Sequence, residues 1–116
     1  MHNFRELKIW KDSIGLAKII YNTCSKFPSY EKYGLVSQLQ RATMSIAANI
    51  AEGSCRNSKD DFKRFLNIAT GSAYEVETLL CIAKEVEYLS DEQFNLLCDE
   101  IQRIEKMIYN FNQQLK

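Results

Sequence analysis

Apolar residues recur at alternating intervals of three and four positions along almost the whole of this 116-residue chain. This interval places them on one side of an α-helix, whereas a half-buried strand requires alternation at every second position. The pattern breaks at the only proline, Pro28, and in polar stretches near residues 55–58 and 89–91. We therefore predict one all-α domain over residues 1–116, an antiparallel up-down-up-down four-helix bundle with helices at about 4–26, 31–54, 59–88 and 91–115.

The first predicted helix has two apolar lines instead of one. The line that we expect to face the core contains Leu7, Trp10, Ile14, Ala17, Tyr21 and Cys24. A second line, displaced around the helix, contains Ile9, Leu16, Ile20 and Phe27. Because one packing seam needs only one line, the second indicates another packing partner. We predict that this second line forms an interface between copies of the chain, in a dimer or in a ring.

The overall composition argues against several classes of protein. The chain has 15 Lys and Arg against 15 Asp and Glu, so its formal net charge is 0, which argues against a dedicated basic nucleic-acid binder. The N-terminus lacks the pattern of a secretory signal, and no apolar run approaches the roughly 18 residues of a membrane-spanning helix. The spacing of the four cysteines fits no disulfide framework. We therefore predict a cytoplasmic protein with free thiols and no membrane association.

The residue types that catalysis usually needs are scarce. The only histidine is His2, so metal sites built on Glu-x-x-His pairs, and Ser-His or Cys-His nucleophile pairs, lack an essential part. The four glycines are isolated from one another and form no phosphate-binding loop. The sequence therefore predicts no catalytic residues, no metal site and no cofactor, and a protein that is not an enzyme.

Basic residues are unevenly distributed along the chain. The N-terminal half is mildly basic and the C-terminal half mildly acidic, and the turn into the third predicted helix is flanked by Arg56, Lys59, Lys63 and Arg64. Two interpretations remain open at this point. The cluster is either a solvated helix face, which is the commoner case, or a patch that contacts phosphate groups.

A line of polar residues runs among the apolar positions of the second predicted helix. Its members are Gln38, Arg41, Ser45, Asn49 and Glu52, spaced three or four positions apart. Buried polar groups need partners, and Ser72 and Glu75 of the third helix are the nearest candidates. We interpret these residues as a structural polar network that fixes the register of the two helices, with a ligand site as the less favoured alternative. We also expect Gly53 to end the second helix in a left-handed conformation, and the small run Gly71-Ser72-Ala73 to face the small residues of that helix.

Three motifs in this region resemble a known family. They are Gln38-x-x-Arg41-Ala42-x-x-Ser45-Ile46-x-x-Asn49-Ile50-Ala51-Glu52-Gly53-x-x-Arg56, the preceding Phe27-Pro28-x-x-Glu31-x-Tyr33-Gly34-Leu35, and the later Phe65-Leu66-x-Ile68-Ala69-x-Gly71-Ser72-Ala73-x-Glu75. Together they resemble the bacterial four-helix-bundle family of 23S rRNA intervening-sequence proteins. The chain departs from the family pattern at Gln40, where a second Arg is usual, and at Ala47, where Pro is usual.

The resemblance implies more than the residues alone. Relatives of this family include accessory proteins of diversity-generating retroelements, which form barrel-shaped homopentamers and bind nucleic acid together with a reverse transcriptase. It therefore implies a homopentamer, with rRNA or another nucleic acid, and a reverse transcriptase, as the partners to test.

Two readings of the function follow. In the first, the chain is a non-enzymatic homo-oligomer that contacts RNA through the region of Arg41, Arg56, Lys59, Lys63 and Arg64. In the alternative, it is a protein–protein interaction scaffold that does not bind nucleic acid.

Overall fold

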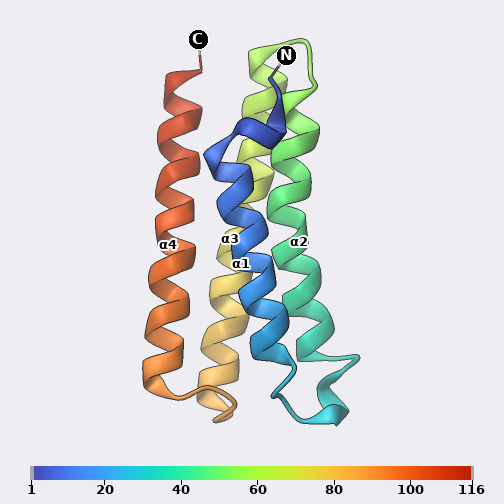
Figure 1. Ribbon diagram of the computed structural model, residues 1–116, viewed down its shortest axis with the longest axis vertical. Coiled ribbons are helices and arrows are strands. Elements are labelled where there is room, and N and C mark those ends of the chain that lie inside the picture. Colours follow the sequence, from blue (N-terminus) through green and yellow to red (C-terminus); the bar gives the residue numbers. More distant parts are fainter. Residues whose placement is uncertain (1, 116) are drawn as a thin grey trace.

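The computed structural model describes residues 2–115 and has four α-helices (Figure 1). These are α1 (Lys8–Cys24), α2 (Leu35–Ser54), α3 (Lys59–Glu85) and α4 (Asp91–Gln114), with two short 3-10 turns, η1 (Phe4–Glu6) and η2 (Ser29–Glu31). Successive helices run in opposite directions and form a bundle 44 × 24 × 20 Å in extent, and the described residues contain no strand. The predicted all-α, up-down-up-down four-helix bundle is confirmed.

Two helices begin later than the sequence pattern predicts. The side chain of Asn3 accepts a hydrogen bond from the Arg5 amide and caps η1, and the extended backbone of Leu7 separates this turn from α1. Before α2, the carboxylate of Glu31 accepts the Leu35 amide at 3.2 Å, beyond a break at Gly34. Local side-chain caps therefore divide what apolar periodicity alone reads as continuous helix.

The turn from α3 to α4 contains the only non-glycine residue with positive φ in the described chain, Glu87 at φ 67°. The amide of Tyr88 donates back to the Ala83 carbonyl at 2.8 Å, which closes the last turn of α3 and ends this helix at Glu85. The next helix, α4, begins with a capping box in which Ser90 and Gln93 each accept the other's backbone amide.

The orientation of α1 corrects the predicted oligomer interface. Ile9, Leu16, Ile20 and Phe27 are at most 7% exposed and lie in the core of the bundle, whereas Ile14 is 45% and Tyr21 43% exposed. Both lines have helical spacing, so periodicity alone could not distinguish them. The Ile and Leu side chains of the buried line lose nothing polar on burial, whereas Trp and Tyr on the other line retain polar edges that favour solvent. The line that was expected to face the core is therefore divided: Cys24 is buried, whereas Ile14 and Tyr21 form an exposed apolar face.

Helices α2 and α3 form the most extensive contact of any pair of helices in the described chain. A Cβ atom added to Gly53 would lie 2.7 Å from the Phe65 Cβ and 2.8 Å from the Phe62 Cδ1, so only glycine fits at this crossing. Gly53 lies within α2, and no described glycine has positive φ, so it acts through close packing and not as the predicted left-handed helix end. In the run Gly71-Ser72-Ala73, Ser72 contacts Ser45 of α2 and Ala73 is buried, as predicted, but a Cβ at Gly71 would meet open space, so Gly71 itself does not pack against α2.

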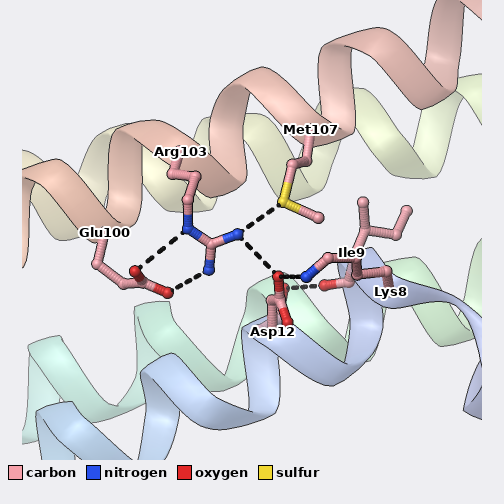
Figure 2. A network of polar contacts seen from close by, with 7 residues as sticks. Lys8, Ile9, Asp12, Glu100, Arg103 and Met107 are labelled. Carbon is pink, nitrogen blue, oxygen red and sulfur yellow. Dashed lines mark hydrogen bonds and ion pairs between the residues drawn. The ribbon is translucent and has the colours of Figure 1, made fainter.

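Helices α1 and α4 share a less extensive contact and are joined by charged side chains (Figure 2). The guanidinium of Arg103 on α4 donates to Asp12 of α1 at 2.9 Å and to Glu100 at 2.6 Å, and Lys8 reaches the same Asp12 oxygen at 2.9 Å. The hydrogen bond and charge of Lys8, followed by those of Arg103, lower the pKa of the Asp12 carboxyl despite its partial burial. A charge cluster therefore links the first and last helices.

Helices α3 and α4 share a seam of uncharged and acidic polar groups. Asn112 donates to Asn67, and Gln102 donates to Glu77, both at 3.2 Å. Beside them, burial raises the pKa of Glu105 from 4.5 to about 8, and the neighbouring Glu77 contributes in the same direction. Oxygen Oε2 of Glu105 is buried and accepts no hydrogen bond from the described residues, so the protonated carboxyl is favoured in this seam.

Candidate nucleic-acid interface

The basic residues predicted to contact RNA divide into two places. Arg56 lies in the turn just after the end of α2, while Lys59, Lys63 and Arg64 occupy the first two turns of α3. Arg41 lies 15 residues before Arg56, about 22 Å away along the axis of α2. The structure therefore brings together four of the five residues at one corner of the bundle, the α2–α3 corner, and leaves Arg41 outside it.

Two of the four corner cations stack on one aromatic ring. The guanidinium carbon atoms of Arg56 and Arg64 lie 4.7 and 4.6 Å from the centroid of the Phe65 ring. Arg56 also pairs with Glu52 at 2.8 Å, and Arg64 pairs with Asp61 at 3.0 Å. Stacking orders both guanidinium groups, but each already has a carboxylate partner that reduces its local charge.

A half-open cavity of about 310 Å³ lies at the same corner. Its lining includes His2, Arg56, Asn57, Lys59, Phe62 and Leu115. Nitrogen-bearing side chains therefore surround a hollow that has no carboxylate among its lining residues.

The N-terminal segment completes this cavity. The backbone amide of His2 donates to the Ser54 carbonyl at 3.0 Å, and its imidazole packs edge-on against Phe62 with ring centroids 5.2 Å apart. Sequence reasoning missed His2 and Asn57 as site residues. No local pattern connects His2 with a turn more than fifty positions away, and only the hydrogen bond to Ser54 places it there.

Arg56 has one donor without a partner. Its Nε–H is buried and forms no hydrogen bond within residues 2–115, although a terminal nitrogen of the same guanidinium reaches Glu52. A buried donor without an acceptor is uncommon in folded proteins. Because this nitrogen has almost no solvent-exposed surface, a ligand in the cavity can reach Arg56 only through the terminal nitrogens of its guanidinium.

Only three residues of the predicted polar network are hydrogen-bonded to one another. The side-chain amide of Asn49 donates to the carbonyl and hydroxyl oxygens of Ser45, and the Ser72 hydroxyl donates to the Ser45 hydroxyl at 2.8 Å. Glu52 instead pairs with Arg56. Gln38, Arg41 and Glu75 are exposed and form no side-chain hydrogen bond within the described part of the chain. The hydrogen bond between Ser45 and Ser72 is the contact in this group that joins α2 to α3.

Exposed apolar residues lie on α1 and α2 around the contact of Tyr21 with Met44. They are the half-buried Trp10 and the exposed Ile14, Tyr21, Met44 and Ala48, spaced so that they share one face of each helix, and we call them the α1–α2 strip. Its centre is fixed by a hydrogen bond of 3.4 Å from the Tyr21 hydroxyl to the sulfur of Met44, a residue that is 49% exposed. Contiguous exposed apolar surface of this kind marks a protein contact more often than isolated apolar side chains do.

Other kinds of site are not seen in the described residues. All four cysteines are free thiols, as predicted, with Cys24 and Cys98 buried and Cys55 and Cys81 exposed. Burial raises the pKa of both buried thiols to about 11, which keeps them protonated and unreactive. No group of three or more His, Cys, Asp or Glu side chains between residues 2 and 115 is arranged to hold a metal ion. None of the described helices has both the length and the apolar character needed to cross a membrane.

These features define a small all-α bundle protein with a polar corner cavity and an exposed apolar strip. Residues 5–110 match the model of the family described as 23S rRNA-intervening sequence protein. This match covers most of the chain, so the chain belongs to that family, in agreement with the resemblance found in its motifs.

A solved structure has the same fold. It is a protein of unknown function from the S23 ribosomal protein family of Bacteroides thetaiotaomicron, with 27% sequence identity and a TM-score of 0.82. The similarity covers 91% of this chain and 99% of the other. No curated protein matches the chain.

Proposed function

We propose that the protein is a non-enzymatic, cytoplasmic homo-oligomer that contacts RNA through the α2–α3 corner. The observation that carries this proposal is the corner cavity, which has Arg56 and Lys59 in its lining and no carboxylate. Phosphate groups bind such clusters through charge and hydrogen bonds, and these interactions supply most of the sequence-independent affinity for nucleic acid. The name of the family, which refers to 23S rRNA, supports RNA as the nucleic acid to test first.

The neutral net charge is compatible with this proposal if the charge is unevenly displayed. In a symmetric assembly, every copy presents its corner in the same direction, so the local positive potential is repeated around the axis. We propose a homopentamer, as the family resemblance implies, with the α1–α2 strip as the surface in contact between copies. A reverse transcriptase remains a proposed partner on the same basis.

The RNA proposal is tested by titrating the protein with structured rRNA and with generic RNA at low salt. We expect binding that weakens linearly as the logarithm of salt concentration rises. The double variant Arg56→Gln/Lys59→Gln should reduce this salt slope by about 0.7 to 0.9 for each phosphate group that it no longer neutralises. The matched control is Lys11→Gln/Lys18→Gln, which removes two exposed charges from α1. Absence of salt-dependent binding by the unmodified protein would contradict the RNA proposal.

The α1–α2 strip favours the alternative function, an interaction scaffold without nucleic-acid binding. Light scattering on the unmodified protein tests assembly, and a monomer in dilute solution contradicts both oligomeric readings. The variant Ile14→Lys/Tyr21→Lys should dissociate the oligomer, because it places charges in the apolar contact. Leu96→Lys on α4 is the control, since Leu96 is also exposed and lies outside the strip. An oligomer that does not bind RNA would favour the scaffold.

A further inference from the structure

The corner cavity has the features of a site for an anionic oxygen ligand. Arg56 contributes a partly exposed guanidinium, and Lys59 contributes an exposed ammonium from the start of α3. The amide of Asn57 and the imidazole of His2 add further hydrogen-bonding groups to the lining. All of these groups can donate to an anion, and several of them converge on one hollow.

The size and floor of the cavity limit the ligand further. Its volume of about 310 Å³ exceeds what an inorganic ion requires and is at the lower end of the range for small-ligand sites, about 300 to 1,000 Å³. Apolar atoms of Phe62 and Leu115 form part of the wall, so the space beside the anion is suited to the less polar part of a ligand. A phosphate group attached to a sugar and base has this combination of charge and apolar surface.

The arrangement of the cations favours a strand end over the middle of a strand. A continuous backbone needs positive charges in a row, but Arg41 is about 22 Å from the corner along α2. Arg64 is already paired with Asp61, and neither Arg64 nor Lys63 lines the cavity. A terminal phosphate monoester carries more negative charge than an internal diester and needs only one compact site.

We propose that the α2–α3 corner cavity binds the terminal phosphate monoester of an RNA strand, with Arg56 and Lys59 as the principal contacts. This inference rests on the proposed RNA-binding function and specifies which part of the RNA the corner recognises. The terminal nitrogens of the Arg56 guanidinium, whose side chain is 37% exposed, donate to one phosphate oxygen, and Lys59 pairs with another.

The experiment measures the affinity of the full chain for short RNA strands of one sequence by titration calorimetry. The strands carry a 5′-phosphate, a 3′-phosphate or hydroxyl groups at both ends, and free adenosine monophosphate is tested as a competitor. We expect at least one phosphorylated strand to bind about tenfold more tightly than the hydroxyl strand, the effect of one or two charge-assisted hydrogen bonds. We expect Arg56→Gln and Lys59→Gln each to remove most of this difference.

Lys63→Gln is the matched control, because it removes the same charge one turn farther along α3 and does not line the cavity. It should leave the ratio between phosphorylated and hydroxyl strands unchanged. Circular dichroism of each variant verifies that the bundle remains folded.

Three other outcomes would overturn the end-recognition proposal, and one of them would also overturn the proposed RNA-binding function. Salt-dependent binding of all three strands with equal affinity overturns the end-recognition proposal and leaves the proposed RNA function intact. Competition by adenosine monophosphate at the same affinity as a phosphorylated strand also overturns it, because the cavity would then be a nucleotide site. No binding of any strand overturns both the inference and the proposed function.

Discussion

Two seams of the bundle are held together in opposite ways. Between α2 and α3, Gly53 lets Phe65 come within 2.7 Å of where a Cβ would lie, and the polar contact from Ser72 to Ser45 is uncharged. Between α1 and α4, the contact is less extensive, and the ion pair of Arg103 with Asp12 joins the two helices. The α2–α3 seam depends on close packing at a residue without a side chain, so its contribution to stability should not change with pH or salt. The α1–α4 seam depends on charge, so its contribution should change with both.

The largest expected effect comes from a substitution that disrupts the α2–α3 seam. Gly53→Ala should destabilise the protein by about 2 kcal/mol, because the new methyl group meets the Phe65 Cβ, which cannot move without the backbone of α3. The matched control is Gly71→Ala, which has open space around it and should stabilise the protein by up to about 1 kcal/mol through helix propensity. Urea denaturation measures both, and two changes of the same sign would contradict the difference between these positions.

The next effect extends the comparison to the α3–α4 seam. Because the folded-state pKa of Glu105 is raised from 4.5 to about 8, its ionisation should destabilise the fold progressively as pH rises through this range. Glu105→Gln should therefore stabilise the protein at pH 9 by about 1 kcal/mol after allowance for solvent screening, and this gain should vanish below pH 4. Thermal denaturation at several pH values measures it, with the exposed Glu85→Gln as control. A gain that does not depend on pH would contradict the prediction.

A smaller effect tests the charged seam itself. Arg103→Gln should destabilise the protein by about 0.5 to 1 kcal/mol at low salt, and less at high salt, because the ion pair with Asp12 is only partly buried and is screened by salt. The pKa of Asp12 is lowered in the folded state, so this contribution exists above its ordinary value of 3.8 and is lost as pH falls below it. Lys106→Gln, one turn along α4, serves as the control. An equal loss at low and high salt would contradict the charge explanation.

The smallest effect concerns the uncharged hydrogen bond of the close seam. Ser72→Ala should cost about 0.5 kcal/mol, because the loss of the hydrogen bond to Ser45 is partly offset by the better helix propensity of alanine. A double-mutant cycle with Ser45→Ala isolates the coupling between the two hydroxyls. Coupling that changes with salt would place this seam in the same class as the α1–α4 seam.

The sequence predicted much of the fold but less of the candidate site. Periodicity and capping residues such as Ser90 and Gln93 are local properties, and they predicted the four helices and the start of α4. The rotation of α1 was not predictable, since two lines with the same spacing compete and only packing against the other helices selects the one containing Leu16. The corner cavity was missed in part because His2 reaches it through a contact with Ser54, a residue far away in sequence.

The aromatic residues provide intrinsic optical reporters at opposite ends of the bundle. Trp10, the only tryptophan, packs edge-on against Phe4 with ring centroids 5.1 Å apart. It lies in the first turn of α1, a few residues after His2. At the far end, the Tyr30 and Tyr88 hydroxyls lie 3.0 Å apart, and Tyr88 donates to Glu31 at 2.8 Å. Tryptophan fluorescence therefore follows the Trp10 end alone during unfolding without any added label, whereas tyrosine absorbance includes the Tyr30–Tyr88 pair but sums over all six tyrosines. Coincident transitions mark a single cooperative unit, and separated transitions show that the Trp10 end opens apart from the rest.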